Sequence, residues 1–233
     1  MSLRAAIAPE TYDERLAWYQ ENCLAGTAQW LFDNRNFHRW ADLTKGVVPS
    51  RWIYLHGIPG SGKSHVAAAA VDHIRLKMKV ESHSRPVLYG LINHTSKLGL
   101  TTLSVLKALL FQVVEDDPDL QCFLIQSKMS DLRGSVTRIT ELLEATLLPM
   151  SGAEYSVPSY IVVDGIDEME ETERLQLLRQ LCVIADACAN LRIMVSSREE
   201  HDIAATAKKQ KAKAICVNAN NEHSIEAYVN HRM

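Results

Sequence analysis

The sequence lacks the features that define several classes of protein. Its five cysteines are an odd number, are scattered without a Cys-x-x-Cys spacing and lie mostly within apolar segments. This pattern argues against a disulfide framework or a zinc site, so we expect reduced, largely buried thiols in a cytoplasmic protein. No apolar run approaches the roughly 20 residues of a membrane span, and the N-terminus lacks a secretory signal. We therefore expect no membrane contact.

A strong excess of either charge is also missing. The formal net charge of the 233 residues is -3 at pH 7, which gives no overall attraction to nucleic acid or anionic lipid. One basic run, AKKQKAK (207–213), reads more simply as a solvated connection, so we do not expect nucleic acid as a partner. With 47% hydrophobic residues, the chain can bury the core of one large domain.

Five short apolar runs predict the strands of a buried sheet, at 52–56, 87–93, 160–164, 191–197 and 214–218. Segments of helical period separate these runs. Two apolar stripes predict buried helix faces, at Leu103, Leu106, Leu110 and Val113 and at Leu175, Leu178, Leu181 and Ala185. The alternation predicts an α/β fold of three layers, α/β/α, with a five-stranded, mainly parallel sheet that binds its ligand at the carboxyl ends of the strands.

The two ends of the chain lack the alternation of strand and helix patterns seen in the middle part. Residues 1–50 hold three of the four tryptophans and no convincing strand, which predicts a helical lead-in broken near 23–26 and at 46–49. Residues 51–219 are expected to form the core. Residues 220–233 predict the start of a further helix that the sequence cuts short, so we expect a piece of a larger protein.

The segment GIPGSGKS (57–64) matches the phosphate-binding pattern GxxxxGK[ST] at every fixed position. Its glycines let successive backbone N–H groups point inward at the N-terminus of the next helix, where a phosphate binds. Lys63 is expected to reach the β- and γ-phosphates, and Ser64 to take one Mg²⁺ position. The predicted nucleotide-binding set is Gly57, Ile58, Pro59, Gly60, Ser61, Gly62, Lys63, Ser64 and the adjoining His65. The predicted ligand is a magnesium nucleoside triphosphate, with ATP and GTP both open.

A second motif supplies acidic side chains. YIVVDGIDEME (160–170) is an apolar strand that ends in Asp164, the position of a carboxylate that holds Mg²⁺ directly or through water. Asp167 and Glu168 lie just beyond the strand end, where either could polarise an attacking water, and the sequence does not decide between them. A solvated first helical turn is the simpler alternative for both. We expect residues 169–171 to be plain surface helix.

A third motif, RIMVSSREE (192–200), places Arg198 at the end of a strand. In an α/β domain of this kind, the strand between the other two motifs projects a polar residue at the γ-phosphate. Arg198 could therefore sense that phosphate through a charge-assisted hydrogen bond. The alternative is a surface arginine paired with Glu199 or Glu200.

In this order, and after CLAGTAQWLFDNRNFHRW (23–40), the three motifs resemble the NACHT domains of the STAND class of signal-transduction NTPases, within the ASCE type of P-loop NTPase. The likeness is closest to fungal NOD-like receptors that include heterokaryon-incompatibility proteins. It covers residues 23 to about 231. By position, the resemblance implies Mg²⁺ at Ser64 and Asp164, and passage of the nucleotide base at Gly26 and Thr27. It implies a catalytic set of Lys63, Asp167, Glu168 and Arg198.

The resemblance also implies a function. It suggests a signalling switch, driven by nucleotide binding and slow hydrolysis, for innate-immunity-like or incompatibility responses. Such a protein would self-associate in its full-length form, with effector and repeat-sensor domains outside this chain. Two alternatives stay open from the residues, a P-loop kinase or phosphotransferase and a nucleic-acid-associated ATPase of the AAA+ kind. Trp30, Leu31 and Trp40 are expected in the core and not stacked on the base.

Overall fold

The computed structural model describes residues 4, 7, 9, 11–23, 26–43, 50–81, 86–94, 100–115, 117–126, 135–148 and 157–221. The predicted break at 46–49 lies outside these residues. So does nearly all of the helix predicted over 220–233, of which only Asn220 and Asn221 are described.

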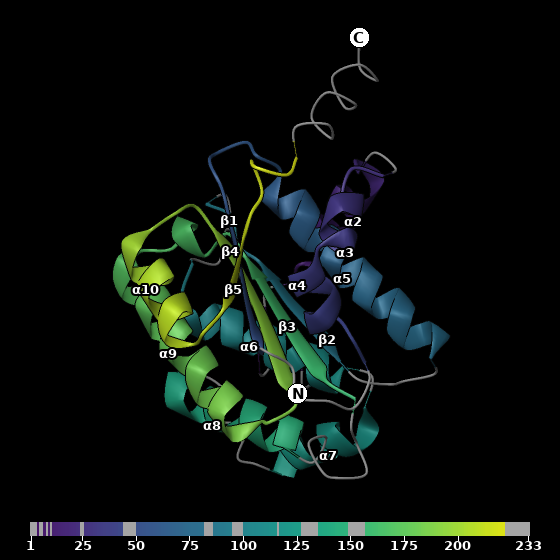
Figure 1. Cartoon of the computed structure of the whole chain (residues 1–233). Coiled ribbons are helices and arrows are strands. Elements are labelled where there is room, and N and C mark those ends of the chain that lie inside the picture. Colours follow the sequence, from purple (N-terminus) through teal and green to yellow (C-terminus); the bar gives the residue numbers. More distant parts are fainter. Residues whose placement is uncertain are drawn as a thin grey trace.

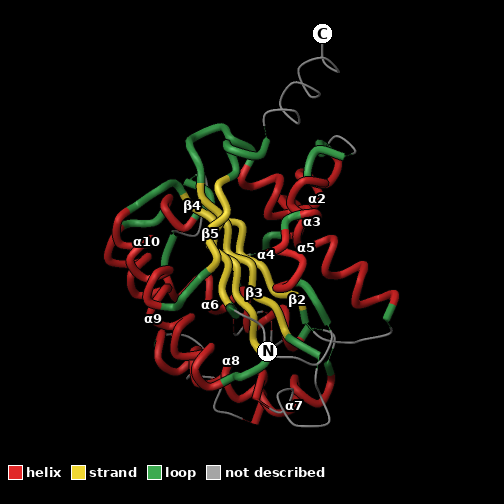
Figure 2. The backbone as a smooth tube through the Cα atoms, in the orientation of Figure 1, coloured by secondary structure: helices red, strands yellow, loops and turns green. Residues whose placement is uncertain are grey.

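Five parallel strands form one sheet in the order β2-β3-β4-β1-β5 (Figures 1 and 2). The strands are β1 (Trp52–His56), β2 (Val87–Leu91), β3 (Ser159–Asp164), β4 (Leu191–Ser197) and β5 (Lys213–Cys216). The predictions for β1 and β4 are confirmed to the residue, and the other three differ by one or two residues at their ends. Every residue of β2, β3 and β4 is buried, because helices cover both faces of the sheet.

The helices form two layers, one on each face, which confirms the predicted three-layer α/β fold (Figure 1). One face is covered by α5 (Lys63–Val80), with α2 (Asp13–Glu21), α3 (Gln29–Asp33) and α4 (Arg35–Trp40) beside it. The other face carries α6 (Thr102–Val114), α7 (Pro118–Gln126), α8 (Val136–Leu147), α9 (Glu171–Ala187) and α10 (His201–Lys209). Each layer buries its own apolar cluster against the sheet.

Helix α5 lies close to the sheet because its inner face is made of small residues. Ala67, Ala68 and Ala70 are buried against the strands. The lead-in helices then close over α5. Leu31 and Trp40 are buried there as predicted, whereas Trp30 is only partly buried. None of the helices in the described residues is both long and apolar enough to cross a bilayer.

The expectations about the burial of Leu175 and of the cysteines are wrong. Leu175 is 41% exposed, and the buried face of α9 consists of Leu177, Leu178, Leu181, Ile184 and Ala185. Each helical residue turns the chain by about 100°, which places Leu175 about 120° from the centre of that face. The cysteines form no disulfides, as predicted, but only Cys188 is buried and Cys122 is exposed on α7.

Arg192, at the start of β4, fixes the lead-in to the sheet. Its side chain donates to the backbone carbonyls of Trp40 and Asp42, where α4 ends, and to the Tyr160 hydroxyl at 3.2 Å. Only 5% of the residue is exposed, and burial lowers the pKa of its guanidinium. A buried cation of this kind is tolerated because its Nη1 lies within hydrogen-bonding distance of three oxygens.

Replacing Arg192 with methionine is expected to lower the free energy of unfolding by about 3 kcal/mol, because the Trp40 and Asp42 carbonyls lose their buried donor. Urea denaturation followed by circular dichroism measures the change. Arg39→Met is the matched control, since Arg39 is exposed on α4, and should cost less than about 0.5 kcal/mol. Equal stability of the two variants would contradict the anchoring role.

Candidate functional site

The sheet topology brings the three sequence motifs to one edge. β4 lies between β1 and β3, as predicted, and because the strands are parallel their carboxyl ends meet there. Burial lowers the pKa of Lys63, and the nearby carboxylates of Asp167, Asp164 and Glu168 oppose this effect. The positive charge of the Arg198 guanidinium lowers the pKa of Lys63 further. The four predicted catalytic residues and Asp164 therefore share one electrostatic neighbourhood.

The lysine at the end of the loop between β1 and α5 is hydrogen-bonded to backbone carbonyls at the start of the loop. The Lys63 ammonium donates to the carbonyls of Gly57 and Ile58, each at 2.9 Å. The tip of the loop, Ile58 to Gly60, is exposed. A flexible ammonium held beside backbone oxygens can exchange those partners for phosphate oxygens.

Two features of the loop suit an anion. Gly62 has φ +87° and caps the N-terminus of α5, a conformation that residues with a side chain rarely adopt. The helix therefore begins with unpaired N–H groups directed at the loop. The Ser61 hydroxyl is buried and has no hydrogen-bond partner among the described residues, which suits a polar ligand.

The two predicted metal ligands lie side by side. Asp164 is 2% exposed, and it accepts hydrogen bonds from the hydroxyls of Ser196, at 2.6 Å, and Ser64. Burial raises the pKa of Asp164, and the two hydroxyls oppose that rise. A hydroxyl and a carboxylate are oxygen ligands that fit Mg²⁺, which usually completes its shell with phosphates and water.

The chain turns sharply after Asp164, and glycine is required there. Gly165 has φ +76°, and a side chain would bring its Cβ within 2.5 Å of the Ile92 carbonyl oxygen. The turn leads into a short 3-10 helix, η3 (Ile166–Glu168), which carries the two remaining acids. The expectation of an exposed residue 169 is wrong, because Met169 is buried under α9 and only 3% exposed.

Asp167 and Arg198 form an ion pair. The Arg198 Nε donates to one carboxylate oxygen at 2.6 Å, and the Arg198 backbone N–H donates to the other at 3.0 Å. The Asp167 side chain is 5% exposed and that of Arg198 49% exposed. Arg198 thus pairs with an acid of the second motif. The alternative, a pairing with Glu199 or Glu200, is wrong because the partner is Asp167.

Glu168 is held by a residue that sequence reasoning missed. One of its oxygens accepts from the backbone N–H of His94 at 2.6 Å and lies 2.9 Å from the His94 Nδ1. His94 follows β2 and belongs to no recognisable motif, so only the pairing of β2 with β3 could have indicated its proximity. The Glu168 side chain is 29% exposed, and both contacts with His94 are made by the same oxygen, Oε2.

The lead-in flanks the loop more closely than the sequence suggested. Tyr19 on α2 makes a side-chain hydrogen bond with Ser64, and its ring lies 4.9 Å from that of His65. His65 is thus placed next to the loop, but its ring packs in an aromatic cluster. Gly26 and Thr27 form the turn before α3, and Thr27 contacts Cys23.

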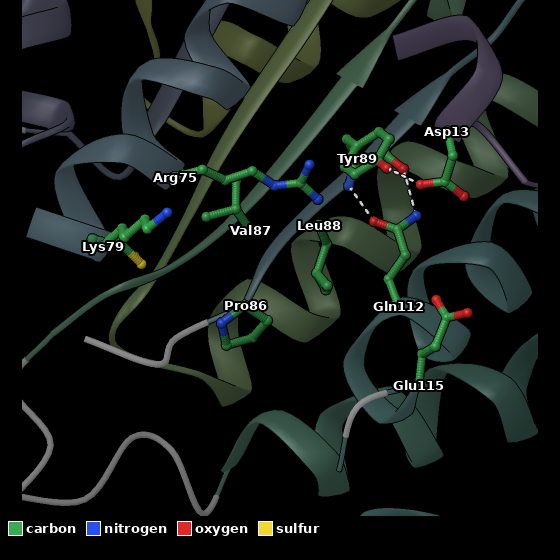
Figure 3. A pocket seen from close by; sticks show the side chains of 10 residues that line it. Asp13, Arg75, Lys79, Pro86, Val87, Leu88, Tyr89, Gln112 and Glu115 are labelled. Carbon is green, nitrogen blue, oxygen red and sulfur yellow. Dashed lines mark hydrogen bonds between the residues drawn. The ribbon is translucent and has the colours of Figure 1, made fainter. Parts of the chain in front are cut away.

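A separate cavity of about 470 Å³ lies at the outer edge of the sheet, beside β2 (Figure 3). There the Gln112 amide pairs with the backbone of Tyr89, accepting from its N–H at 2.9 Å and donating to its carbonyl at 2.8 Å. The Tyr89 hydroxyl donates to Asp13, and burial raises the pKa of Tyr89 to about 12. Gln112 therefore occupies the hydrogen-bonding positions that a further strand would use.

Replacing Gln112 with leucine is expected to expose this strand edge and promote self-association. The Tyr89 N–H and carbonyl would lose their partners, at a cost of about 1 kcal/mol in the free energy of unfolding. Sedimentation velocity over a concentration series should then show dimers or larger species. Gln176→Leu, at an exposed position of α9, adds the same apolar surface away from the edges of the sheet. Its self-association should equal that of the wild type. Equal association of both variants would refute edge protection.

Comparisons with known proteins agree with this architecture. Residues 26–198, which contain the first two motifs and the third as far as Arg198, match the family model described as "Nephrocystin 3, N-terminal". A search of curated proteins gives no significant match.

Solved structures extend the comparison of the fold. The structure of the Aeropyrum pernix ORC1 protein in complex with DNA aligns with a TM-score of 0.57 and 17% identity, covering 98% of this chain and 53% of that one. Cdc6p from Pyrobaculum aerophilum aligns with a TM-score of 0.50 and 13% identity, covering 92% and 48%. The chain thus spans about half the length of these structures, and at such identities the likeness concerns the fold alone.

Proposed function

The chain belongs to the nephrocystin 3 N-terminal family, and from this premise we propose that it binds a magnesium nucleoside triphosphate and acts as a slow NTPase switch. One observation carries the proposal. The phosphate loop, the buried Asp164, the acids of η3 and Arg198 meet at the carboxyl ends of three adjacent strands. We propose that residues 51–219 form this module, with residues 1–50 as its lead-in and the chain from 220 on as the start of a following region.

Phosphate binding falls to residues Gly57 to His65. The backbone N–H groups around Gly62 point at the β-phosphate, and Lys63 exchanges its contacts with the Gly57 and Ile58 carbonyls for the β- and γ-phosphate oxygens. Ser64 and Asp164 would hold Mg²⁺, which would neutralise charge on the phosphates. Gly26 and Thr27 flank the base, which is adenine or guanine.

Glu168 is the better candidate for the base that polarises water. Asp167 uses both carboxylate oxygens on Arg198, so its charge is already matched. Both contacts of Glu168 with His94 use one oxygen, Oε2, and its side chain is partly exposed. The role of Asp167 is then to position Arg198.

Arg198 gives the site a way to report its state. In the described part of the chain, its half-exposed side chain pairs with the Asp167 carboxylate, which a γ-phosphate can replace as a stronger, doubly charged acceptor. Loss of that phosphate returns Arg198 to Asp167. Such an exchange gives the Arg198 side chain two arrangements, one for each nucleotide state, which is the requirement for a switch.

The wider role follows from the resemblance to NACHT domains. We propose that nucleotide state controls self-association of the full-length protein, and that effector and repeat-sensor domains lie outside this chain. In that role the rate of hydrolysis sets how long the triphosphate-bound state lasts, so slow hydrolysis is sufficient.

Single-turnover hydrolysis tests this function against its alternatives. With protein in excess over γ-labelled ATP or GTP, we expect labelled inorganic phosphate as the product, at a rate below about 1 s⁻¹. Transfer of the label to added small-molecule acceptors, at about 1 s⁻¹ or faster, would instead indicate a kinase. Stimulation by single-stranded DNA or RNA with a steep salt dependence would indicate a nucleic-acid-associated ATPase.

A further inference from the structure

Two asparagines that follow β5 contact the phosphate loop. Asn218 Oδ1 accepts from the Ile58 N–H at 3.3 Å, and Asn221 Nδ2 donates to the Ser61 carbonyl at 2.8 Å. The chain reaches this position because β5 pairs with β1, the strand that enters the loop, and the Val217 N–H continues that pairing to the His56 carbonyl. Both ends of the loop are thus supported by a segment about 160 residues away in the sequence.

Asn221 also contacts the lead-in. Its Oδ1 accepts from the Trp30 indole N–H at 3.2 Å, and only 6% of the residue is exposed. The indole can only donate and the Ser61 carbonyl can only accept, so the orientation of the Asn221 amide is fixed from both sides. Of the ordinary side chains this short, only an amide can fill this place, since it offers a donor and an acceptor on two separate atoms.

Asn221 further defines the shape of the loop at Gly62. A Cβ on Gly62 would lie 2.8 Å from the Asn221 Nδ2, so the amide packs directly against the residue that caps α5. Ser61 and Gly62 are the loop residues that precede Lys63. Moving Asn221 therefore releases the backbone that aims N–H groups at phosphate.

We propose that Asn221 is a positioning residue for the nucleotide site, and that it couples the phosphate loop to the lead-in through Trp30. This inference rests on the proposed function of the loop. Among the described residues, Asn221 contacts Ser61, Gly62 and Trp30, and it acts on the site through them. Because binding couplings are reciprocal, nucleotide in the loop also strengthens the docking of α3.

A double-mutant cycle on nucleotide affinity tests the coupling. Asn221→Ala should raise the Kd for ATP and for ADP by about tenfold, because the loop loses a buried hydrogen bond. Trp30→Phe keeps the ring and removes only its N–H, so it should raise the Kd about threefold. The double variant should bind no more weakly than Asn221→Ala alone, because both changes remove the same link.

Two further variants separate the roles. Asn221→Asp keeps the acceptor for Trp30 but loses the donor to Ser61, and it should weaken binding at least as much as Asn221→Ala. Asn220→Ala is the matched control, since the Asn220 amide donates to the Cys216 carbonyl and not to the loop, and its Kd should stay within about twofold of wild type. At saturating ATP the single-turnover rate of Asn221→Ala should stay within about threefold of wild type, because Glu168 and Arg198 are untouched.

The outcomes distinguish this inference from the function on which it rests. Failure of the wild-type chain to bind nucleotide would overturn the proposed function, and the inference with it. Normal wild-type binding with an unchanged Kd for Asn221→Ala and Asn221→Asp would overturn the inference alone. If the effects of Asn221→Ala and Trp30→Phe on the free energy of nucleotide binding were additive, the proposed coupling to the lead-in would be contradicted.

Discussion

Lys63→Ala is expected to abolish the thermal stabilisation of the chain by ATP. A ligand at about 100 times its Kd stabilises the folded state by about 2.7 kcal/mol, which for a chain of this size raises the melting temperature by roughly 5 to 10 °C. The variant loses the cation that meets the β- and γ-phosphates, so its shift should fall below about 1 °C. Differential scanning fluorimetry with and without Mg-ATP measures both.

The control for this result is a lysine of the same charge far from the loop. Lys208→Ala lies on the exposed side of α10, and its ATP-dependent shift should equal that of the wild type. Lys63→Ala should also fold normally without nucleotide, because the hydrogen bonds of its ammonium to the described residues are all with carbonyls of the loop. If ATP raised the melting temperature of Lys63→Ala as much as that of the wild type, the assignment of the nucleotide site to this loop would be contradicted.

Glu168→Gln is expected to slow hydrolysis by about 10²- to 10³-fold while leaving the Kd for ATP within about threefold. The amide keeps the size of the side chain and can still accept from the His94 N–H, but it cannot polarise water as a carboxylate does. Single-turnover release of labelled phosphate gives the rate, and equilibrium binding gives the Kd.

Two neighbouring acids serve as comparisons for Glu168. Glu170→Gln changes an exposed acid just before α9 and should hydrolyse as wild type. Asp167→Asn should have a smaller effect on rate, because its loss frees Arg198 without removing the base. If Asp167→Asn were the slower variant and Glu168→Gln hydrolysed normally, the roles assigned to the two acids would be reversed.

Much of the fold was predictable because it depends on local pattern. Apolar runs bounded by polar residues located all five strands, and the βα alternation gave the parallel sheet. The turn at Gly62 follows from the loop pattern, since only glycine adopts its φ without strain. The meeting of Lys63 with the second and third motifs then follows from the rule that parallel strands end at one edge.

The contacts that complete the site were not predictable in this way. His94 and Asn221 reach the site only through strand pairing, from positions 74 and 160 residues distant from Glu168 and Ser61. Neither belongs to a motif, and an isolated His or Asn gives no signal in a single sequence. The Leu175 error has a different cause, because two overlapping leucine stripes run along α9 and only packing decides which is buried.

The most direct test of the nucleotide site is equilibrium binding of ATP and GTP to the wild-type chain, with Mg²⁺ and with a chelator. We expect saturable binding of about one nucleotide per chain for at least one of the two, weakened about tenfold or more when Mg²⁺ is removed. Absence of saturable binding at millimolar nucleotide with Mg²⁺ present would contradict it.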